Sequence, residues 1–145
     1  MCIRDSLLNP AREIAKTLHA LLSDDVAVQA VLGVPARLYD NPPEDPVFPY
    51  LTYGPMRSSD AGGDEADIQT HTLTLHLWSR YGGRSEVIDA ISAVTSALGQ
   101  SEAMDGAIHI VRTQVLYTDI FRDPDGQTLH GLIRFLLTTD QTPDI

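Results

Sequence analysis

IQTHTLTLHLWS, residues 68–79, alternates in side-chain character along its length and is the clearest strand in this sequence of 145 residues. Successive side chains of a strand point to opposite faces of the sheet. One face would carry a histidine and three leucines: His71, Leu73, Leu75 and Leu77. The other would carry hydroxyl and aromatic groups: Thr70, Thr72, Thr74, His76 and Trp78. The pattern predicts a strand with an aliphatic face for a core and a second face of Thr, His and Trp.

The segment that follows, RYGGRSEVIDAISAVTSALG at residues 80–99, predicts a glycine corner and a helix over 85–98, with Ser85 as its N-cap. The order strand, glycine turn, helix also occurs in nucleotide-binding proteins. A phosphate loop needs Gly-Lys-Ser/Thr, whereas Gly83 is followed by Arg84, and a dinucleotide fingerprint needs three spaced glycines. We therefore interpret Gly82-Gly83 as a structural corner.

Three further strands are predicted at 50–54, 107–120 and 127–138. In the strand predicted at 107–120, the aliphatic side chains change from one face to the other near Val111, which indicates a β-bulge. FRDPDGQ, residues 121–127, is typical of a hairpin turn, because Pro124 and Asp125 suit its central positions and Gly126 accepts a positive φ.

The N-terminal part predicts a helix over 10–22, capped by Asn9 and ended by Ser23-Asp24-Asp25. The same three residues can cap a short second helix, VAVQAVL, which Gly33 closes. Four prolines between positions 42 and 49 exclude a helix there. We expect one α+β domain over 9–139, with an antiparallel sheet of about four strands. The helices 10–22 and 85–98 should pack on the face that bears the three leucines. Residues 1–8 are interpreted as a non-native or disordered leader and 140–145 as a flexible tail.

PMRSSDAGGDEAD, residues 55–67, is polar, acidic and rich in glycine. Such a composition buries little apolar surface, so we expect a loop that is mobile in the free subunit. Its carboxylates could bind a cation, but a solvated charge run is the more common explanation: they are Asp60, Asp64, Glu65 and Asp67.

The sequence contains no recognisable catalytic or metal-binding motif, so we expect neither an enzyme nor a cofactor. The five histidines, at positions 19, 71, 76, 109 and 130, lack ligand spacing and are interpreted as surface or edge residues. Cys2 is the only cysteine, which excludes an internal disulfide. The formal net charge of −10 disfavours sequence-independent binding of nucleic acid, and no apolar run is long enough to span a membrane.

The order of these features resembles a known family. VLGVPARLYDNPPEDPVFPYLTYGP, residues 31–55, is similar to the opening signature of the tail-completion, or tail-terminator, proteins of long-tailed phages and gene transfer agents. The acidic segment, the strand ending in Trp78-Ser79, the glycine corner and the FRDPDG hairpin follow in the family's order. The resemblance covers about residues 8–139.

The resemblance implies a structural protein of the virion tail, assembled in the host cytoplasm, without catalytic residues. Family members form a ring, usually a hexamer, on the head-proximal end of the tail tube, where the ring stops tube growth and joins the head connector. The expected partners are copies of the chain itself, the tail tube protein and the head–tail connector protein. DNA is expected only as passing cargo, and no membrane is involved.

The subunit interface is expected to use the acidic segment and the polar face of strand 68–79: Arg57, Asp60, Asp64, Glu65, Asp67, His76 and Trp78. Trp78 could instead lie under a helix end, since an exposed tryptophan is costly unless covered. An alternative from another class is a small ligand-binding or enzymatic α+β domain that uses the segment 56–67.

Overall fold

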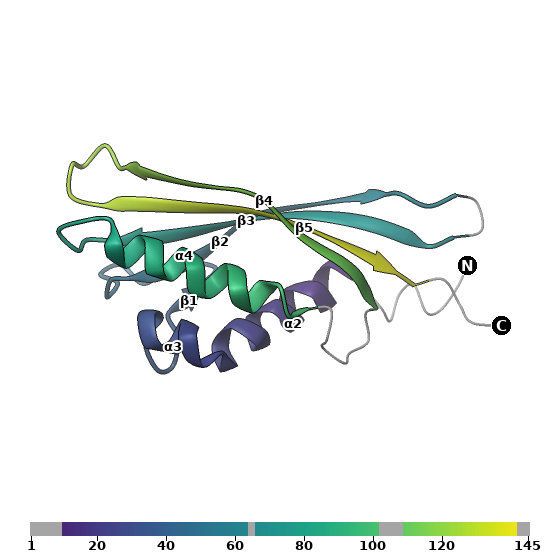
Figure 1. The fold of residues 1–145 in the computed structure, drawn as a ribbon, viewed down its shortest axis with the longest axis horizontal. Helices are drawn as coiled ribbons and strands as arrows, with labels where there is room; N and C mark the ends of the chain where they lie inside the picture. The colour runs from purple at the N-terminus through teal and green to yellow at the C-terminus, as the bar shows by residue number, and fades with distance from the viewer. Residues whose placement is uncertain (1–9, 64–65, 102–108, 142–145) are drawn as a thin grey trace.

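The computed structural model describes residues 10–63, 66–101 and 109–141, which form one five-stranded sheet with helices on a single face (Figure 1). Along the chain the elements are α2 (Pro10–Asp24), α3 (Val26–Leu32), β1 (Leu38–Tyr39), β2 (Tyr50–Asp60), β3 (Ile68–Ser79), α4 (Ser85–Leu98), β4 (Ile110–Arg122) and β5 (Leu129–Asp140). The strand order is β1-β2-β3-β5-β4. The two-residue β1 is parallel to β2 and the other pairs are antiparallel, which confirms the predicted α+β class and adds one short strand.

The core lies between the sheet and the helices, as the alternation of strand 68–79 predicts. Leu73, Leu75 and Leu77 of β3 are buried in it. Many of the other large members come from β5, α4 and α2: Leu129, Ile133, Phe135, Leu137, Val87, Val94, Leu98, Ile14, Leu18 and Leu22. Burial of this apolar surface is the main force that holds the helical layer on the sheet.

Helix α4 crosses β5 at Gly131, where the two elements approach too closely for a side chain. A Cβ atom placed on Gly131 would lie 2.7 Å from Cγ2 of Val87 and 3.1 Å from Cδ1 of Ile91. The absence of a side chain at this position therefore sets the distance between the helix and the sheet.

Two of the predicted helix ends are confirmed and one is wrong. The backbone N–H of Val28 donates to Oδ1 of Asp25 at 3.0 Å, and Gly33 ends α3 with a φ of 94°. Ser85, the predicted cap of α4, is instead its first residue, and Arg84 precedes it without a capping hydrogen bond. The corner is held differently, because Oγ of Ser79 donates to Oε1 of Glu86 at 2.7 Å. Asn9, the cap predicted for α2, lies outside the described residues.

The prediction of a loop from residue 55 is wrong for residues 55–60, because β2 continues to Asp60 and pairs with β3. The register shifts between Tyr53 and Met56, so Gly54 and Pro55 form a bulge after which pairing resumes. Met56 then packs against the core, which anchors the continued strand. The polar composition of this segment indicated a loop, whereas its backbone hydrogen bonds with β3 hold it in the sheet.

The second hairpin agrees with the sequence. β4 has a register shift between Ile110 and Arg112, which confirms the bulge expected near Val111, and a second shift between Val115 and Tyr117. In the turn that joins β4 to β5, Gly126 has a φ of 77°, which favours glycine.

Candidate interaction surface

The helices cover one face of the sheet (Figure 1). The opposite face, here called the open face, carries the alternate side chains of the four long strands that point away from the helices. Four aromatic rings form a row across it. Tyr50 of β2 is paired with Trp78 of β3, Trp78 with His130 of β5, and His130 with Phe121 of β4. We call these four residues the aromatic row.

Ring contacts join the members of the aromatic row. The Trp78 and His130 rings are stacked, with centroids 4.0 Å apart, and Phe121 lies 4.5 Å from His130 on the other side. Tyr50 is more loosely stacked, 6.3 Å from Trp78. Paired aromatic residues of neighbouring strands stabilise a sheet at such distances.

A second histidine joins the row through a hydrogen bond. Nδ1 of His76 lies 2.7 Å from Nε2 of His130, so one ring donates and the other accepts. Burial lowers the pKa of both imidazoles, and for His130 the neighbouring His76 lowers the pKa further. The neutral form of both rings is therefore favoured on the open face.

Trp78 does not lie under a helix end, so that alternative is wrong. The indole is half-buried on the open face, and its N–H donates to Oγ1 of Thr52 at 3.0 Å. Tyr50 and His130 cover part of its surface on either side.

The interpretation of all five histidines as surface or edge residues is also wrong. His71 is fully buried on the helical side of the sheet, where Nδ1 lies 2.7 Å from Oγ of Ser58 and Nε2 lies 3.0 Å from Oγ1 of Thr139. Both hydroxyl partners come from neighbouring strands, so the ring is satisfied without solvent. His130 is buried as well, whereas His19 and His109 are exposed.

Next to the aromatic row, Arg80 links the glycine corner to the β4–β5 hairpin. Its guanidinium carbon lies 4.5 Å from the centroid of Phe48 and its Nη2 lies 3.5 Å from Oδ2 of Asp125. Hydrogen bonds from the side chain and the backbone of Thr128, and from the backbone of Gln127, lower the pKa of Asp125 to about 2. These contacts fix the turn beside the row.

The residues proposed for the interface lie in two places. His76 and Trp78 lie beside the aromatic row, whereas Arg57 and Asp60 are exposed at the far end of β2. Asp60 lies ten positions along β2 from Tyr50, or about 30 Å of extended strand. Asp67 is exposed near the same far end, and Asp64 and Glu65 lie outside the described residues.

The interface predicted from the sequence did not include three members of the aromatic row, Tyr50, Phe121 and His130. The alternation of residues 129–137 could have placed His130 opposite the core leucines, on the same face as Trp78. The row itself could not be inferred, because it depends on the register between strands that are far apart in the sequence.

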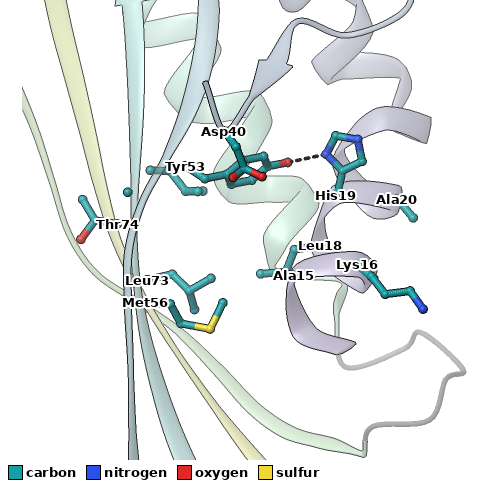
Figure 2. Close-up of a pocket in the computed structure, with 12 residues that line it drawn as sticks. Ala15, Lys16, Leu18, His19, Ala20, Asp40, Tyr53, Met56, Leu73 and Thr74 are labelled. Atoms are coloured by element: carbon teal, nitrogen blue, oxygen red, sulfur yellow. Dashed lines mark hydrogen bonds between the residues drawn. The ribbon is translucent and has the colours of Figure 1, made fainter. Parts of the chain in front are cut away.

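A groove lies on the helical side, between α2 and strands β2 and β3 (Figure 2). Its volume is about 620 Å³, and its walls are mostly apolar: Ala15, Leu18, Ala20, Met56, Leu73 and Leu75. Nδ1 of His19 and the hydroxyl of Tyr53 lie 2.9 Å apart and join α2 to β2 across it. Burial, and then the charge of Asp40, raise the pKa of Tyr53, so its hydroxyl stays protonated.

The described residues contain no group of three or more histidine, cysteine, aspartate or glutamate side chains placed to hold a metal ion. Among the described helices, none is long and apolar enough to cross a membrane. In the segment that the ligand-binding alternative would use, residues 56–60 are strand rather than loop.

The described part of the chain thus forms a single-layer sheet, with helices on one face and the aromatic row on the other. The chain belongs to the family described as tail completion protein gp17, which it matches over residues 16–140. It is therefore a structural protein of a phage-type virion tail.

Individual relatives agree with the family. The tail completion protein gp17 of Bacillus phage SPP1 is 26% identical over 112 residues, which cover 76% of this chain and 81% of that protein. Its solved structure matches with a TM-score of 0.60 at 21% identity, covering 92% of this chain and 94% of that one. A chain of a native gene transfer agent virion matches with a TM-score of 0.80 at 19% identity, covering 90% and 96%.

Proposed function

We propose that this protein forms a ring of identical subunits at the head-proximal end of a tail tube, ends the growth of the tube and joins the tail to the head connector. The observation that carries the proposal is its membership of the tail completion family, whose match spans most of the chain. Its partners would be copies of itself, the tail tube protein and the connector protein.

The geometry supports an assembled role. Trp78 and Phe121 remain partly exposed on a sheet face that no other layer covers within the described residues. Large aromatic side chains are enriched at protein interfaces, where they contribute much of the binding energy. We infer that the aromatic row contacts another subunit or another tail protein, with His76 and Trp78 in that contact.

The charge of the chain suits a channel through which DNA passes. The sequence has twenty acidic and ten basic residues, so its surface repels phosphate groups overall. A ring of such subunits would let DNA slide without binding it. We infer that DNA meets this protein only as passing cargo.

The test is to remove the gene from a strain that produces the particle and to examine tails by electron microscopy. We expect tubes of irregular length and tails without heads, and both defects should disappear when the wild-type gene is supplied in trans. A ring should be visible at the head-proximal end of complemented tails. Normal, headed tails in the deletion strain would refute the proposal.

A further inference from the structure

The β4 edge of the sheet exposes apolar side chains. In the described part of the chain, no strand pairs with β4 on its outer side. Each of its two bulges contains an aliphatic residue without a Cα partner in β5, namely Val111, which is 43% exposed, and Leu116, which is 41% exposed. Other exposed apolar residues of the strand flank them: Val115, Tyr117 and Phe121.

Bulges at Val111 and Leu116 interrupt the regular ladder of an edge strand and discourage another strand from pairing with it. This edge is therefore poorly suited to extend the sheet into a second molecule. What it offers to a partner is a set of aliphatic side chains, which need an apolar recess.

The opposite edge provides such a recess. The groove between α2 and β2 lies at the β1–β2 side of the sheet, and its volume of about 620 Å³ can take several aliphatic side chains. Small residues on α2, Ala15 and Ala20, keep its mouth open, and Met56 and Leu73 line it from the sheet (Figure 2).

The charges of the two edges are complementary. β4 contains two arginines and one aspartate: Arg112, Arg122 and Asp119. On the groove side, residues 38–60 contain four carboxylates and one arginine: Asp40, Glu44, Asp45, Asp60 and Arg57. Helix α2, the other wall of the groove, adds two cations and two carboxylates, so this side stays acidic overall: Arg12, Lys16, Glu13 and Asp24. In a chain of net charge −10, the β4 edge is the one better suited to face the acidic edge of another copy.

We propose that the β4 edge of one subunit, with Leu116 at its centre, inserts into the α2–β2 groove of a second copy of this chain. The two surfaces lie on opposite edges of one sheet, so the contact is heterologous and can repeat around a closed ring. The proposal rests on the proposed function, because it names the lateral contact of that ring.

The first test is chemical cross-linking in assembled tails. In a Cys2→Ser background, which removes the only native cysteine, Leu116→Cys and Ala15→Cys are introduced together and a short bis-maleimide is added. The double variant should give a ladder of linked subunits on a denaturing gel. Each single variant alone should give none, and tails built from a mixture of the two single variants should stop at linked dimers.

Two results would overturn the inference. Cross-linking by Leu116→Cys alone would show a contact between two β4 edges, and tails with a visible ring but no ladder from the double variant would place the contact elsewhere. Failure of the proposed function is distinguishable from either, because it would appear as headed tails of normal length without this protein.

The second test remains decisive if the cysteine variants do not assemble. Ala15→Trp fills the groove from an exposed position of α2, and Ser96→Trp adds the same bulk to an exposed position of α4. Ala15→Trp should reduce headed tails roughly tenfold or more, on the scale of an interface hot spot. Adding Leu116→Ala should restore part of the loss, and Ser96→Trp should behave as the wild type. Equal particle yields from the two tryptophan variants, with equal thermal stability, would refute the proposed contact between the β4 edge and the groove.

Discussion

His76 and His130 share one hydrogen bond, 2.7 Å from Nδ1 of the first ring to Nε2 of the second, on the open face of the sheet. Trp78 stacks on His130 at 4.0 Å, and Phe121 contacts it from β4. A hydrogen bond between two imidazoles requires at least one of them to be neutral, and proton uptake by both would place two cations in contact. The chemistry of the open face is therefore sensitive to pH.

The first prediction concerns stability in mild acid. The pKa values of His71, His76 and His130 all lie below the ordinary 6.5 in the fold, chiefly through burial. The unfolded chain then binds more protons than the folded one below pH 6.5, so the free energy of unfolding should be constant above that pH and fall as the pH drops below it. Urea unfolding at a series of pH values between about 7.5 and 5 would measure this fall, because that range spans the ordinary pKa of histidine.

Trp78 is the only tryptophan, so its fluorescence reports on the row alone. A protonated imidazole quenches a stacked indole, and the emission should fall with an apparent pKa below 6.5. His130→Gln should remove this titration. A fluorescence titration that is unchanged in His130→Gln would contradict the assignment.

The second prediction tests the core. Leu75 is almost fully buried between the sheet and the helices, so Leu75→Ala should lower the free energy of unfolding by about 2–5 kcal/mol. Ile88→Ala, at a position of α4 that is 49% exposed, is the matched control and should change it by about 0.5 kcal/mol or less. Equal losses from the two variants in urea titrations would mean that the assignment of faces is wrong.

The third prediction concerns the approach of α4 to β5. Gly131→Ala places a methyl group 2.7 Å from Cγ2 of Val87 and should cost about 1–3 kcal/mol of overpacking. Adding Val87→Ala should recover part of that loss, which a double-mutant cycle in urea would measure. Gly83→Ala serves as the control, because a Cβ there meets no heavy atom within 4 Å. Strict additivity of the Gly131 and Val87 variants would refute the close contact.

Local features of the sequence predicted much of this fold. The alternation of Leu73, Leu75 and Leu77 identified the covered face, and the capping residues Ser23-Asp24-Asp25 identified the start of α3. Gly126 identified the turn, because a positive φ is a property of one residue and its neighbours. In each case a few adjacent residues contain the whole physical reason.

The open face could not be predicted in the same way. Tyr50, Trp78, His130 and Phe121 become neighbours only through three strand registers, and the bulge at Gly54–Pro55 changes one of them. The resemblance supplied the family, but it did not indicate these contacts. The composition of residues 55–60 was misleading, because pairing with β3 satisfies the backbone of a polar strand.

The fourth prediction concerns salt. Copies of a subunit with a net charge of −10 repel one another, and salt screens that repulsion over about 10 Å at 0.1 M against about 30 Å at 0.01 M. We expect the purified protein to sediment as a monomer at about 0.01 M salt and to associate as the salt rises toward about 1 M.

The exposed Asp89 of α4 allows a graded control. Asp89→Asn and Asp89→Lys change the net charge from −10 to −9 and −8, since they remove one negative charge or replace it by a positive one. The salt concentration at half association, measured by sedimentation velocity, should fall in that order. Association that weakens with added salt would show instead that attraction between unlike charges governs the contact at long range.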